Sequence, residues 1–371
     1  MTDESIPEQL AGGRLTIDLG ALVANWRTLA ARAPGATTAA VVKADGYGVG
    51  ALEASKALAA AGCGTFFVGL PEEGIRLRAA LPAATIYVLA GLIPGSVEAL
   101  TRANLRPVLG SPTEIDAWIA ARRAGASTGA AIHIDTGMNR LGLTAAEARD
   151  LVAAPDRIAA LAPSLLMSHL ACADTPAHPL NARQLAAFRI VRSALPQVPA
   201  SLANSSGIYL GRDYHFDLTR PGVALYGAVF IDGQPPLQTV AKLEARVLRV
   251  RDVTAGDTVG YGATETAATQ RRIAVLGAGY ADGYHRAASS RDGRSGGRVF
   301  LRGHFAALIG RVSMDLIAVD VTAVRGVEEG DWAELFGPNL PVDEVAARAG
   351  TIGYELLTGL GHRYARRYAA K

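Results

Sequence analysis

The stretch Ala39-Ala40-Val41-Val42-Lys43-Ala44-Asp45-Gly46-Tyr47-Gly48 joins a short apolar run to a glycine-rich turn, and a lysine stands at the junction. An amine held at the end of a buried strand is partly desolvated, which favours the neutral nucleophile that condenses with an aldehyde. Lysines also end strands by turning into solvent, so this stretch alone leaves both interpretations open. A protein-kinase site is excluded, because no glycine-rich loop precedes Lys43 and neither His-Arg-Asp nor Asp-Phe-Gly follows it.

The composition indicates a globular protein that acts on small molecules. The chain has 371 residues, of which 50% are apolar and 19% charged, and its net charge is only +3. Its basic residues are scattered, apart from Arg363, Arg366 and Arg367, so no nucleic-acid footprint is present. The longest uncharged stretch, residues 79–97, is interrupted by proline and glycine and indicates a buried strand rather than a membrane helix.

The cysteines and the N-terminus indicate the cellular compartment in which the protein is expected. Cys63 and Cys172 cannot build a disulfide framework, and the chain has no CxxC or HExxH spacing for zinc. The first ten residues are acidic and polar, without the basic start and apolar core of a secretory signal. We therefore expect a cytoplasmic protein without a metal site.

Short apolar runs alternate with longer helical patterns over the first two thirds of the chain, which is typical of βα units and a parallel sheet. Two of the intervening helices begin with predicted capping boxes, Ser111 to Glu114 and Thr144 to Glu147, and Asp18 is a plausible cap for a helix before the first strand. Eight strands close a barrel. The runs are 38–43, 65–70, 85–90, 106–109, 130–135, 165–169, 200–203 and 218–221.

The remainder of the chain changes to alternating strand patterns, at residues 242–253, 272–276, 298–301 and 316–321. We therefore predict an α/β protein with an N-terminal (β/α)8 barrel of the TIM type, residues 20–238, and a β-rich domain, residues 239–371. The strand-like residues 12–19 are expected to join the second domain. A loop rich in serine, glycine and arginine, residues 288–298, is predicted to be exposed.

Polar residues fall where the barrel strands end, which is where barrel enzymes place their active sites. Lys43 closes the first run, Arg140 follows the fifth, His169 closes the sixth, Asn204 and Ser205 follow the seventh, and Arg220 lies in the eighth. Ser205, Gly222 and Val223 occupy the place where such barrels bind phosphate. A lysine opposite a phosphate cradle suits pyridoxal 5'-phosphate (PLP), although a sugar-phosphate enzyme remains an alternative.

Two glycine-flanked tyrosines stand in the second domain. The segment Gly277 to Gly283 imitates a dinucleotide fingerprint, but Asp282 replaces its third glycine and no helix follows, so we interpret it as a turn that holds Tyr280 and Asp282. Tyr261 lies between Gly260 and Gly262. Flanking glycines let the backbone approach a ligand closely, although such tyrosines are more often packing residues.

With these residues in view, the chain resembles the alanine racemases, two-domain enzymes of PLP fold type III, from Leu15 to Tyr368. The agreement rests on many ordered motifs, which makes a chance match negligible. They are Val41-Val42-Lys43-Ala44-Asp45-Gly46-Tyr47-Gly48, Asp135-Thr136-Gly137-Met138-Asn139-Arg140-Leu141-Gly142, Ser168-His169, Asn204-Ser205, Arg220-Pro221-Gly222, Gly260-Tyr261-Gly262-Ala263-Thr264, Gly279-Tyr280-Ala281-Asp282-Gly283, Gly310-Arg311-Val312-Ser313-Met314-Asp315 and Tyr354-Glu355.

The resemblance implies how the cofactor is bound. Lys43 would carry PLP covalently, and Arg220 would contact the pyridine nitrogen. An arginine there cannot give up its proton, so the ring nitrogen stays unprotonated and side reactions of the carbanion are limited. The residues implied to bind the phosphate are Tyr47, Ser205, Gly222, Val223 and Tyr354, and His169 and Asn204 complete the expected cofactor site.

The resemblance also implies a homodimer with shared active sites, because inversion at Cα needs an acid and a base on opposite faces. Lys43 would serve the D-enantiomer and Tyr261 of the other subunit the L-enantiomer. His169 and Arg220 would lie behind Tyr261 and make its phenolate form accessible. The expected substrate contacts are Arg140 and the backbone of Met314 for the carboxylate, with Tyr261, Tyr280 and Asp315 lining the site.

Two positions depart from the family pattern. His133 stands where many members have a carbamylated lysine, so Arg140 must be oriented otherwise, and Ser313 replaces a cysteine in a mild change. A broader amino-acid racemase of the same fold and a non-catalytic PLP-holding protein remain alternatives. Whether an alanine racemase here would supply D-alanine for peptidoglycan in the cell wall or serve alanine catabolism stays open.

Overall fold

The computed structural model describes residues 6–231 and 233–369, and these divide into two compact units. The barrel unit comprises residues 22–225 and the described residues of 229–236. The β unit comprises the described residues of 1–21, residues 226–228 and the described residues of 237–371. No helix among the described residues is long and apolar enough to span a membrane.

The barrel unit contains a closed ring of parallel strands, which confirms the predicted TIM-type barrel. Strands β3 to β9 pair in sequence order, and β10 pairs with β2, which is the first half of the strand that β3 continues. The ring closes between β9 and β10, where Asp217 N–H donates to Ala200 C=O (3.0 Å) and Arg220 N–H to Ala203 C=O (2.9 Å). The bounds are β2 (Thr37–Thr38), β3 (Ala40–Val41), β4 (Thr65–Val68), β5 (Thr85–Val88), β6 (Arg106–Leu109), β7 (Ala130–His133), β8 (Pro163–Met167), β9 (Ala200–Ser201) and β10 (Leu218–Thr219).

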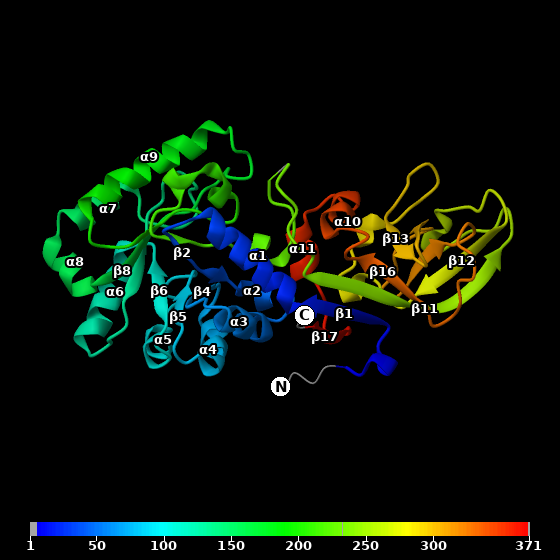
Figure 1. Cartoon of the computed structure of the whole chain (residues 1–371), viewed down its shortest axis with the longest axis horizontal. Coiled ribbons are helices and arrows are strands. Elements are labelled where there is room, and N and C mark those ends of the chain that lie inside the picture. Colours follow the sequence, from blue (N-terminus) through cyan, green and yellow to red (C-terminus); the bar gives the residue numbers. More distant parts are fainter. Residues whose placement is uncertain (1–5, 232, 370–371) are drawn as a thin grey trace. The chain divides into compact units, whose positions relative to one another are not determined.

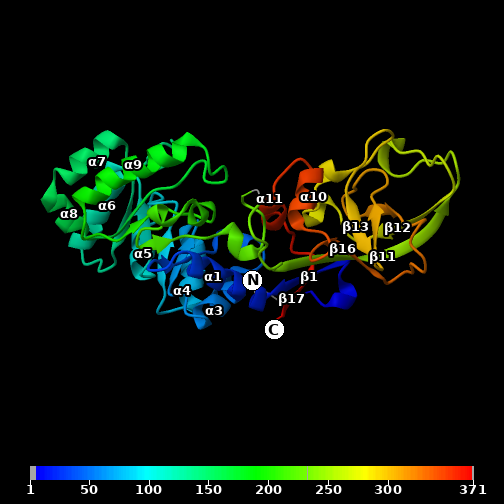
Figure 2. The ribbon, with the colours of Figure 1, turned by 45° about the horizontal axis from the view of Figure 1, so that its top comes forward.

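Helices surround these strands (Figures 1 and 2). Asp18 caps the first helix, since its Oδ1 accepts from Ala21 N–H at 2.8 Å, and Thr144 and Glu147 form the predicted capping box. The box predicted at Ser111 is only half formed, because Glu114 turns its carboxylate to other backbone amides. The helices are α1 (Leu19–Arg32), α3 (Ala51–Ala60), α4 (Pro71–Ala80), α5 (Val97–Arg102), α6 (Pro112–Arg123), α7 (Ala145–Val152), α8 (Pro155–Leu161) and α9 (Pro179–Ala194).

The interior of the barrel is filled by side chains from successive strands, as barrel geometry requires. One cluster takes buried residues from most strands of the ring, and the rings of Phe67 and Tyr87 stack at 4.9 Å between centroids. The cluster consists of Ala39, Val41, Phe67, Tyr87, Val108, Ala131, Leu165, Met167 and Leu218. Because this core is apolar, the polar groups of the barrel must act at its rims.

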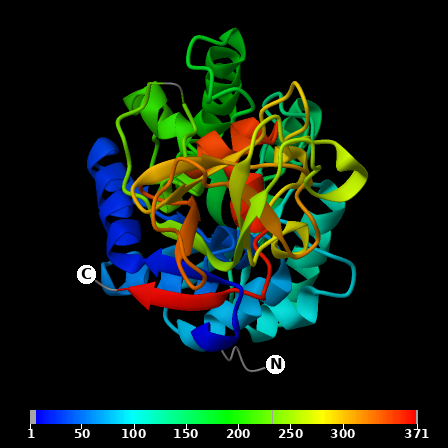
Figure 3. The ribbon, with the colours of Figure 1, turned by 90° about the vertical axis from the view of Figure 1, so that its right-hand side faces the viewer.

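The β unit is built on the long strand β11 (Ala241–Val253), which pairs with β1 (Gly13–Asp18), β12 and β16. β17 (Ala365–Ala369) lies parallel to β1 at the edge of this sheet (Figure 3). The other elements are β12 (Arg271–Leu276), β13 (Arg298–Leu301), β14 (His304–Ala307), β15 (Ile317–Asp320), β16 (Trp332–Phe336), α10 (Val342–Arg348) and α11 (Gly353–Thr358). Sequence analysis did not identify β14, β16 or β17.

Candidate active site

Lys43 stands just beyond the carboxyl end of β3 and begins α2 (Lys43–Tyr47), in which residues 44–47 form a left-handed turn. Ala44, Asp45 and Tyr47 have φ angles of 52°, 53° and 54°, which are unfavourable for residues with a Cβ atom. The turn is held by Gly46 N–H donating to Val42 C=O (2.9 Å), and Asp45 Oδ1 accepts from Ala51 N–H (2.9 Å). Such strain persists only where the surrounding structure over-determines it, and here it fixes the directions of Lys43 and Tyr47.

The amine of Lys43 loses its proton more readily than that of an ordinary lysine. Although the residue is exposed, partial burial lowers the pKa of Lys43, the positive charge of Arg140 lowers it further, and the carboxylate of Glu73 opposes both. A lowered pKa raises the fraction of neutral amine near pH 7. Lys43 therefore suits condensation with an aldehyde and proton transfer.

Arg220 is a buried cation at the end of β10, with only 3% of its surface exposed. Its guanidinium donates to Ser168 C=O (2.6 Å), to Leu202 C=O (3.4 Å) and to the Ser201 hydroxyl. Burial lowers the pKa of Arg220, but a guanidinium starts so high that it stays protonated at neutral pH. The site thus contains a fixed positive charge that carbonyl and hydroxyl oxygens hold in place.

Two histidines of this region are neutral at physiological pH. Burial, reinforced by the nearby charge of Arg220, lowers the pKa of His169 to about 3 and that of His133 to about 4. A neutral imidazole can accept or donate a hydrogen bond without adding charge. His133 therefore cannot replace the anion that a carbamylated lysine would supply.

The loop after β10 forms a small cradle of hydroxyl and amide groups. Ser205 Oγ accepts from Gly222 N–H (3.0 Å) and Ala224 N–H (3.3 Å), so its own hydrogen stays available for a ligand. A Cβ atom on Gly222 would lie 2.3 Å from Tyr47 Oη, so only glycine lets this tyrosine lie against the loop. Val41 N–H donates to Pro221 C=O (2.9 Å), which joins the strand of the lysine to the cradle.

The cradle extends to the neighbouring strand ends. Asn204 forms a parallel bridge with Arg220, and its Oδ1 accepts from Gly207 N–H (2.9 Å). Val223 begins the short helix η4 (Val223–Tyr226) directly after the loop. The barrel unit thus brings together Lys43, Tyr47, His169, Asn204, Ser205, Arg220, Gly222 and Val223 at one rim.

Arg140 follows β7 in a tight loop. Asp135 Oδ1 accepts from the N–H groups of Gly137 (2.8 Å), Met138 (2.9 Å) and Asn139 (3.2 Å), and Asn139 has a positive φ of 55°. The carboxylate of Asp135 is thereby occupied by backbone, and Arg140 itself is exposed. Its guanidinium is accessible to an anionic ligand.

The other predicted residues belong to the β unit, where three of them are unusually exposed. The exposed fractions are 72% for Tyr261, 42% for Tyr280 and 52% for Met314. Tyr280 N–H donates to Ser313 C=O (3.0 Å) and Ala281 N–H to Met314 C=O (3.0 Å), so the tyrosine and methionine segments lie side by side.

Asp315 and Tyr354 also lie in the β unit. Asp315 pairs with Arg363 at 2.8 Å, and Arg363 also pairs with Asp282 at 2.7 Å. Asp315 is therefore engaged with a cation, whereas the resemblance implied that it lines the substrate site. Tyr354 stands in the first turn of α11.

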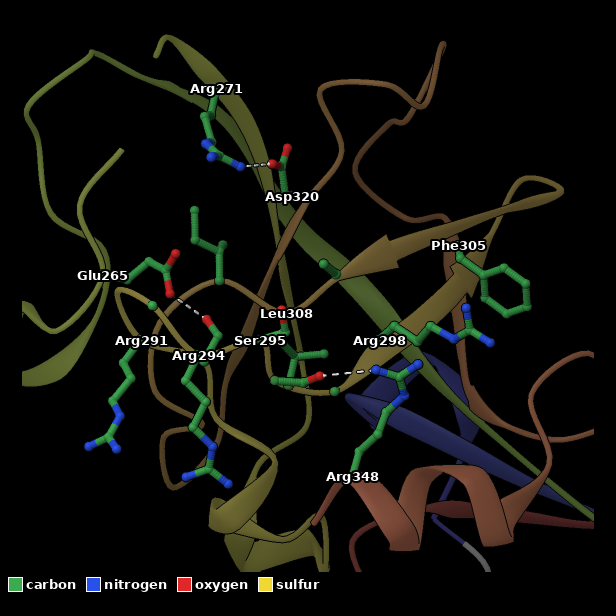
Figure 4. A pocket seen from close by; sticks show the side chains of 16 residues that line it. Glu265, Arg271, Arg291, Arg294, Ser295, Arg298, Phe305, Leu308, Asp320 and Arg348 are labelled. Carbon is green, nitrogen blue, oxygen red and sulfur yellow. Dashed lines mark hydrogen bonds and ion pairs between the residues drawn. The ribbon is translucent and has the colours of Figure 1, made fainter. Parts of the chain in front are cut away.

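A separate cavity of about 520 Å³ in the β unit contains none of the predicted residues (Figure 4). Arg271 pairs with Asp320, and Arg298 and Arg348 both pair with Glu344. In the described part of the chain, no group of three or more histidine, cysteine, aspartate or glutamate side chains is arranged to hold a metal ion.

A lysine beside a hydroxyl-and-amide cradle at the rim of a parallel barrel defines a barrel enzyme that binds a phosphorylated aldehyde. Residues 17–229 match the family model of the alanine racemase N-terminal domain, and residues 240–368 match that of the C-terminal domain. The chain belongs to the alanine racemase family.

Individual relatives agree with both matches. The alanine racemase of Rhizobium meliloti (strain 1021) is 48% identical over 98% of each chain, and that of Methylobacterium nodulans is 51% identical over 96% of each. The crystal structure of alanine racemase from Bartonella henselae with covalently bound pyridoxal phosphate is 40% identical. It has a TM-score of 0.91 and covers 97% of this chain and 100% of its own.

Proposed function

We propose that this chain is a PLP-dependent isomerase that interconverts L-alanine and D-alanine in a homodimer with shared active sites. The observation that carries the proposal is the lysine of lowered pKa beside the Tyr47, Ser205 and Gly222 cradle, in a chain that matches both domains of the family. The exposed Tyr261 of the β unit supplies the second residue that inversion requires.

The barrel rim fits the cofactor. When bound, PLP withdraws electrons from the substrate Cα and makes its proton acidic. Lys43 would hold the aldehyde carbon, and the hydroxyls of Tyr47 and Ser205 would hold the phosphate with the amides of Gly222 and Val223. Asn204, His169 and Tyr354 would complete this site. Arg220 would face the ring nitrogen, where its fixed charge keeps that nitrogen from gaining a proton.

Lys43 and Tyr261 would exchange the Cα proton. The Lys43 amine removes it on one face, and the Tyr261 hydroxyl delivers a proton on the other, so the configuration inverts. His169 and Arg220 would lie behind Tyr261, on the side away from the substrate, and would favour the phenolate form of this tyrosine. The exposed Arg140 and the Met314 backbone would hold the substrate carboxylate.

Each active site would combine the barrel domain of one subunit, residues 20–238, with the β-rich domain of the other, residues 239–371 and the strand at 12–19. The exposure of Tyr261, Tyr280 and Met314 supports this arrangement, because exposed large apolar side chains are available to a partner surface. Tyr280 and Asp315 would line the entrance. We propose a cytoplasmic enzyme, in which PLP and free alanine are the small-molecule partners.

Heterodimers of Lys43→Ala and Tyr261→Ala chains, isolated by two different affinity tags, test the shared site. One of their two sites carries both substitutions and the other carries neither, so about half of the wild-type activity is expected. Homodimers of either variant should be nearly inactive and serve as controls. If Tyr261 acted within its own chain, every site would lack one residue and purified heterodimers would be inactive.

Chiral chromatography of L-alanine, L-serine and L-lysine after incubation with the PLP-loaded enzyme tests the substrate. We expect D-alanine to form fastest. Comparable rates with serine or lysine would identify a broad-specificity racemase instead, and no product from any of them would leave a non-catalytic PLP-holding protein.

A further inference from the structure

Glu73 binds three backbone amides at the rim of the barrel with one carboxylate. The residue lies in the first turn of α4, the helix that follows β4. Its Oε1 accepts from Ala44 N–H at 2.8 Å, and its Oε2 accepts from Gly69 N–H at 2.6 Å and from Leu70 N–H at 3.1 Å. The side chain therefore ties the end of β3 to the end of β4.

The amide of Ala44 belongs to the peptide bond that directly follows Lys43. Ala44 has φ 52° and ψ 53°, and it opens the left-handed turn that continues through Asp45, Gly46 and Tyr47. A charged acceptor makes a stronger hydrogen bond than a neutral one, so Glu73 stabilises the first strained residue of this turn. Releasing the Ala44 amide would let the peptide after Lys43 rotate towards an ordinary conformation.

Glu73 also lies close to the base of the Lys43 side chain. A Cβ atom on Gly69 would be 3.2 Å from Glu73 Oε2 and 3.5 Å from Lys43 Cβ, so a small gap at Gly69 separates the carboxylate from the lysine. The negative charge raises the pKa of Lys43 against the lowering by burial and by Arg140. The hydrogen bond of Glu73 to the Ala44 amide and the negative charge of Glu73 thus both act at Lys43.

The barrel contains a second clamp of the same design. Glu114, in the first turn of α6, accepts from Gly110 N–H (2.7 Å) with Oε2 and from Leu92 N–H (2.9 Å) with Oε1, and so ties the end of β6 to that of β5. No predicted site residue stands at these ends. The two clamps share their structural role and differ in what they hold.

We propose that Glu73 is a positioning residue for Lys43: its carboxylate holds the peptide after Lys43 in the left-handed turn and thereby aims the amine at the reacting atoms. The inference rests on the proposed function, since it assigns Glu73 a part in the same site. Glu114 provides the matched control, because it makes the same kind of contact away from Lys43.

The experiment compares Glu73→Gln with Glu114→Gln. Glutamine keeps the size of the side chain but has one acceptor oxygen instead of two and no charge. Both variants should lose a similar amount of thermal stability. Only Glu73→Gln should lower kcat for both enantiomers of alanine, by about tenfold or more with little change in KM, because misplacement of a catalytic group acts on the chemical step.

A spectroscopic readout separates positioning from general damage. The pH dependence of the rate at which PLP attaches to Lys43 of the apoenzyme reports the pKa of that amine, and loss of the Glu73 charge should move its midpoint to lower pH by about one unit. Glu114→Gln should leave the midpoint unchanged. Equal changes of kcat and midpoint in the two variants, or no change in Glu73→Gln, would overturn the proposal.

Two further measurements keep the outcome decisive. If Glu73→Gln does not fold, Glu73→Asp keeps the charge on a shorter side chain, and we then expect a normal midpoint with a reduced kcat. Borohydride reduction followed by peptide mapping reports labelling of Lys43 without any turnover. A wild-type protein that is labelled at Lys43 but does not racemise alanine would refute the proposed function, and the midpoints of PLP attachment would still test the role of Glu73.

Discussion

Replacing Gly222 with alanine tests whether Tyr47 and Gly222 form one wall of the cofactor site. The added Cβ atom would lie 2.3 Å from Tyr47 Oη and 3.0 Å from Tyr47 Cζ, against about 3.4 Å for an ordinary contact, so the overlap with the hydroxyl is about 1 Å. The φ angle of Gly222 is not in the left-handed region, so the alanine backbone itself is unstrained. The whole effect should therefore pass through Tyr47.

The magnitude follows from the cost of overpacking, which is typically about 1–3 kcal/mol. If Tyr47 moves off the cradle, most of this cost appears as lost cofactor affinity. At 1.4 kcal/mol per factor of ten, the apparent dissociation constant of PLP should rise about 5- to 150-fold. Absorbance titration of the apoenzyme measures it, and thermal unfolding of the apoenzyme shows whether the fold is intact.

A double-mutant cycle with Tyr47→Phe makes the test specific. Removal of the hydroxyl removes the closer of the two contacts, so the double variant should bind PLP better than the sum of the single losses predicts. Gly64→Ala is the control, because no atom lies within 4 Å of its added Cβ. A wild-type PLP affinity in Gly222→Ala, or strictly additive losses, would refute the assignment of this wall.

Three other perturbations have defined outcomes. Gly279→Ala would place a Cβ atom 2.3 Å from Met314 C=O and 2.4 Å from Ser313 C=O, so urea unfolding should show a loss of about 1–3 kcal/mol; a variant as stable as the wild type would contradict the contact. Since His133 has a folded pKa of about 4, below its unfolded value, the unfolded chain binds more protons between these values, and stability falls as the pH falls from 6.5 towards 4. Between pH 7.5 and pH 5 this loss of stability amounts to about 2 kcal/mol. Urea unfolding should show the loss in the wild type and in the exposed His304→Gln variant, but not in His133→Gln. Removal of dissolved CO₂ should leave racemase activity unchanged, because His133 cannot be carbamylated; reactivation by bicarbonate would show that another lysine supplies a carbamate.

The barrel could be predicted from the sequence because most residues of its strands are buried and helices follow most of these strands. Parts of the β unit could not be. β14 and β17 lie at sheet edges, and most of their residues are exposed or half-buried, so their side chains show no continuous apolar run. β17 also depends on pairing with β1, which lies at the other end of the chain. Edge strands of this kind are determined by tertiary contacts rather than by local propensity.

The positions of Lys43, Ser205 and Arg220 were predictable, because each of them lies where a barrel strand ends. The contacts that orient these residues were not. A glutamate in the first turn of a helix predicts a local cap, and Glu114 had been interpreted in that way. In the structure Glu73 and Glu114 reach the preceding strand of the ring, a contact that no pattern within the helix contains.

The charges at the barrel rim explain why the site would select anions. Asp135 and Glu73 each direct their carboxylates to three backbone amides, and the two histidines are neutral. Within residues 6–231 and 233–369, neither Arg140 nor Arg220 forms a salt bridge. The guanidinium of Arg140 is therefore not held by a carboxylate of the described residues, and it remains for a substrate carboxylate. With His133 in place of a carbamylated lysine, no internal anion holds Arg140, so the carboxylate of alanine would compete for that guanidinium only with small anions from solution.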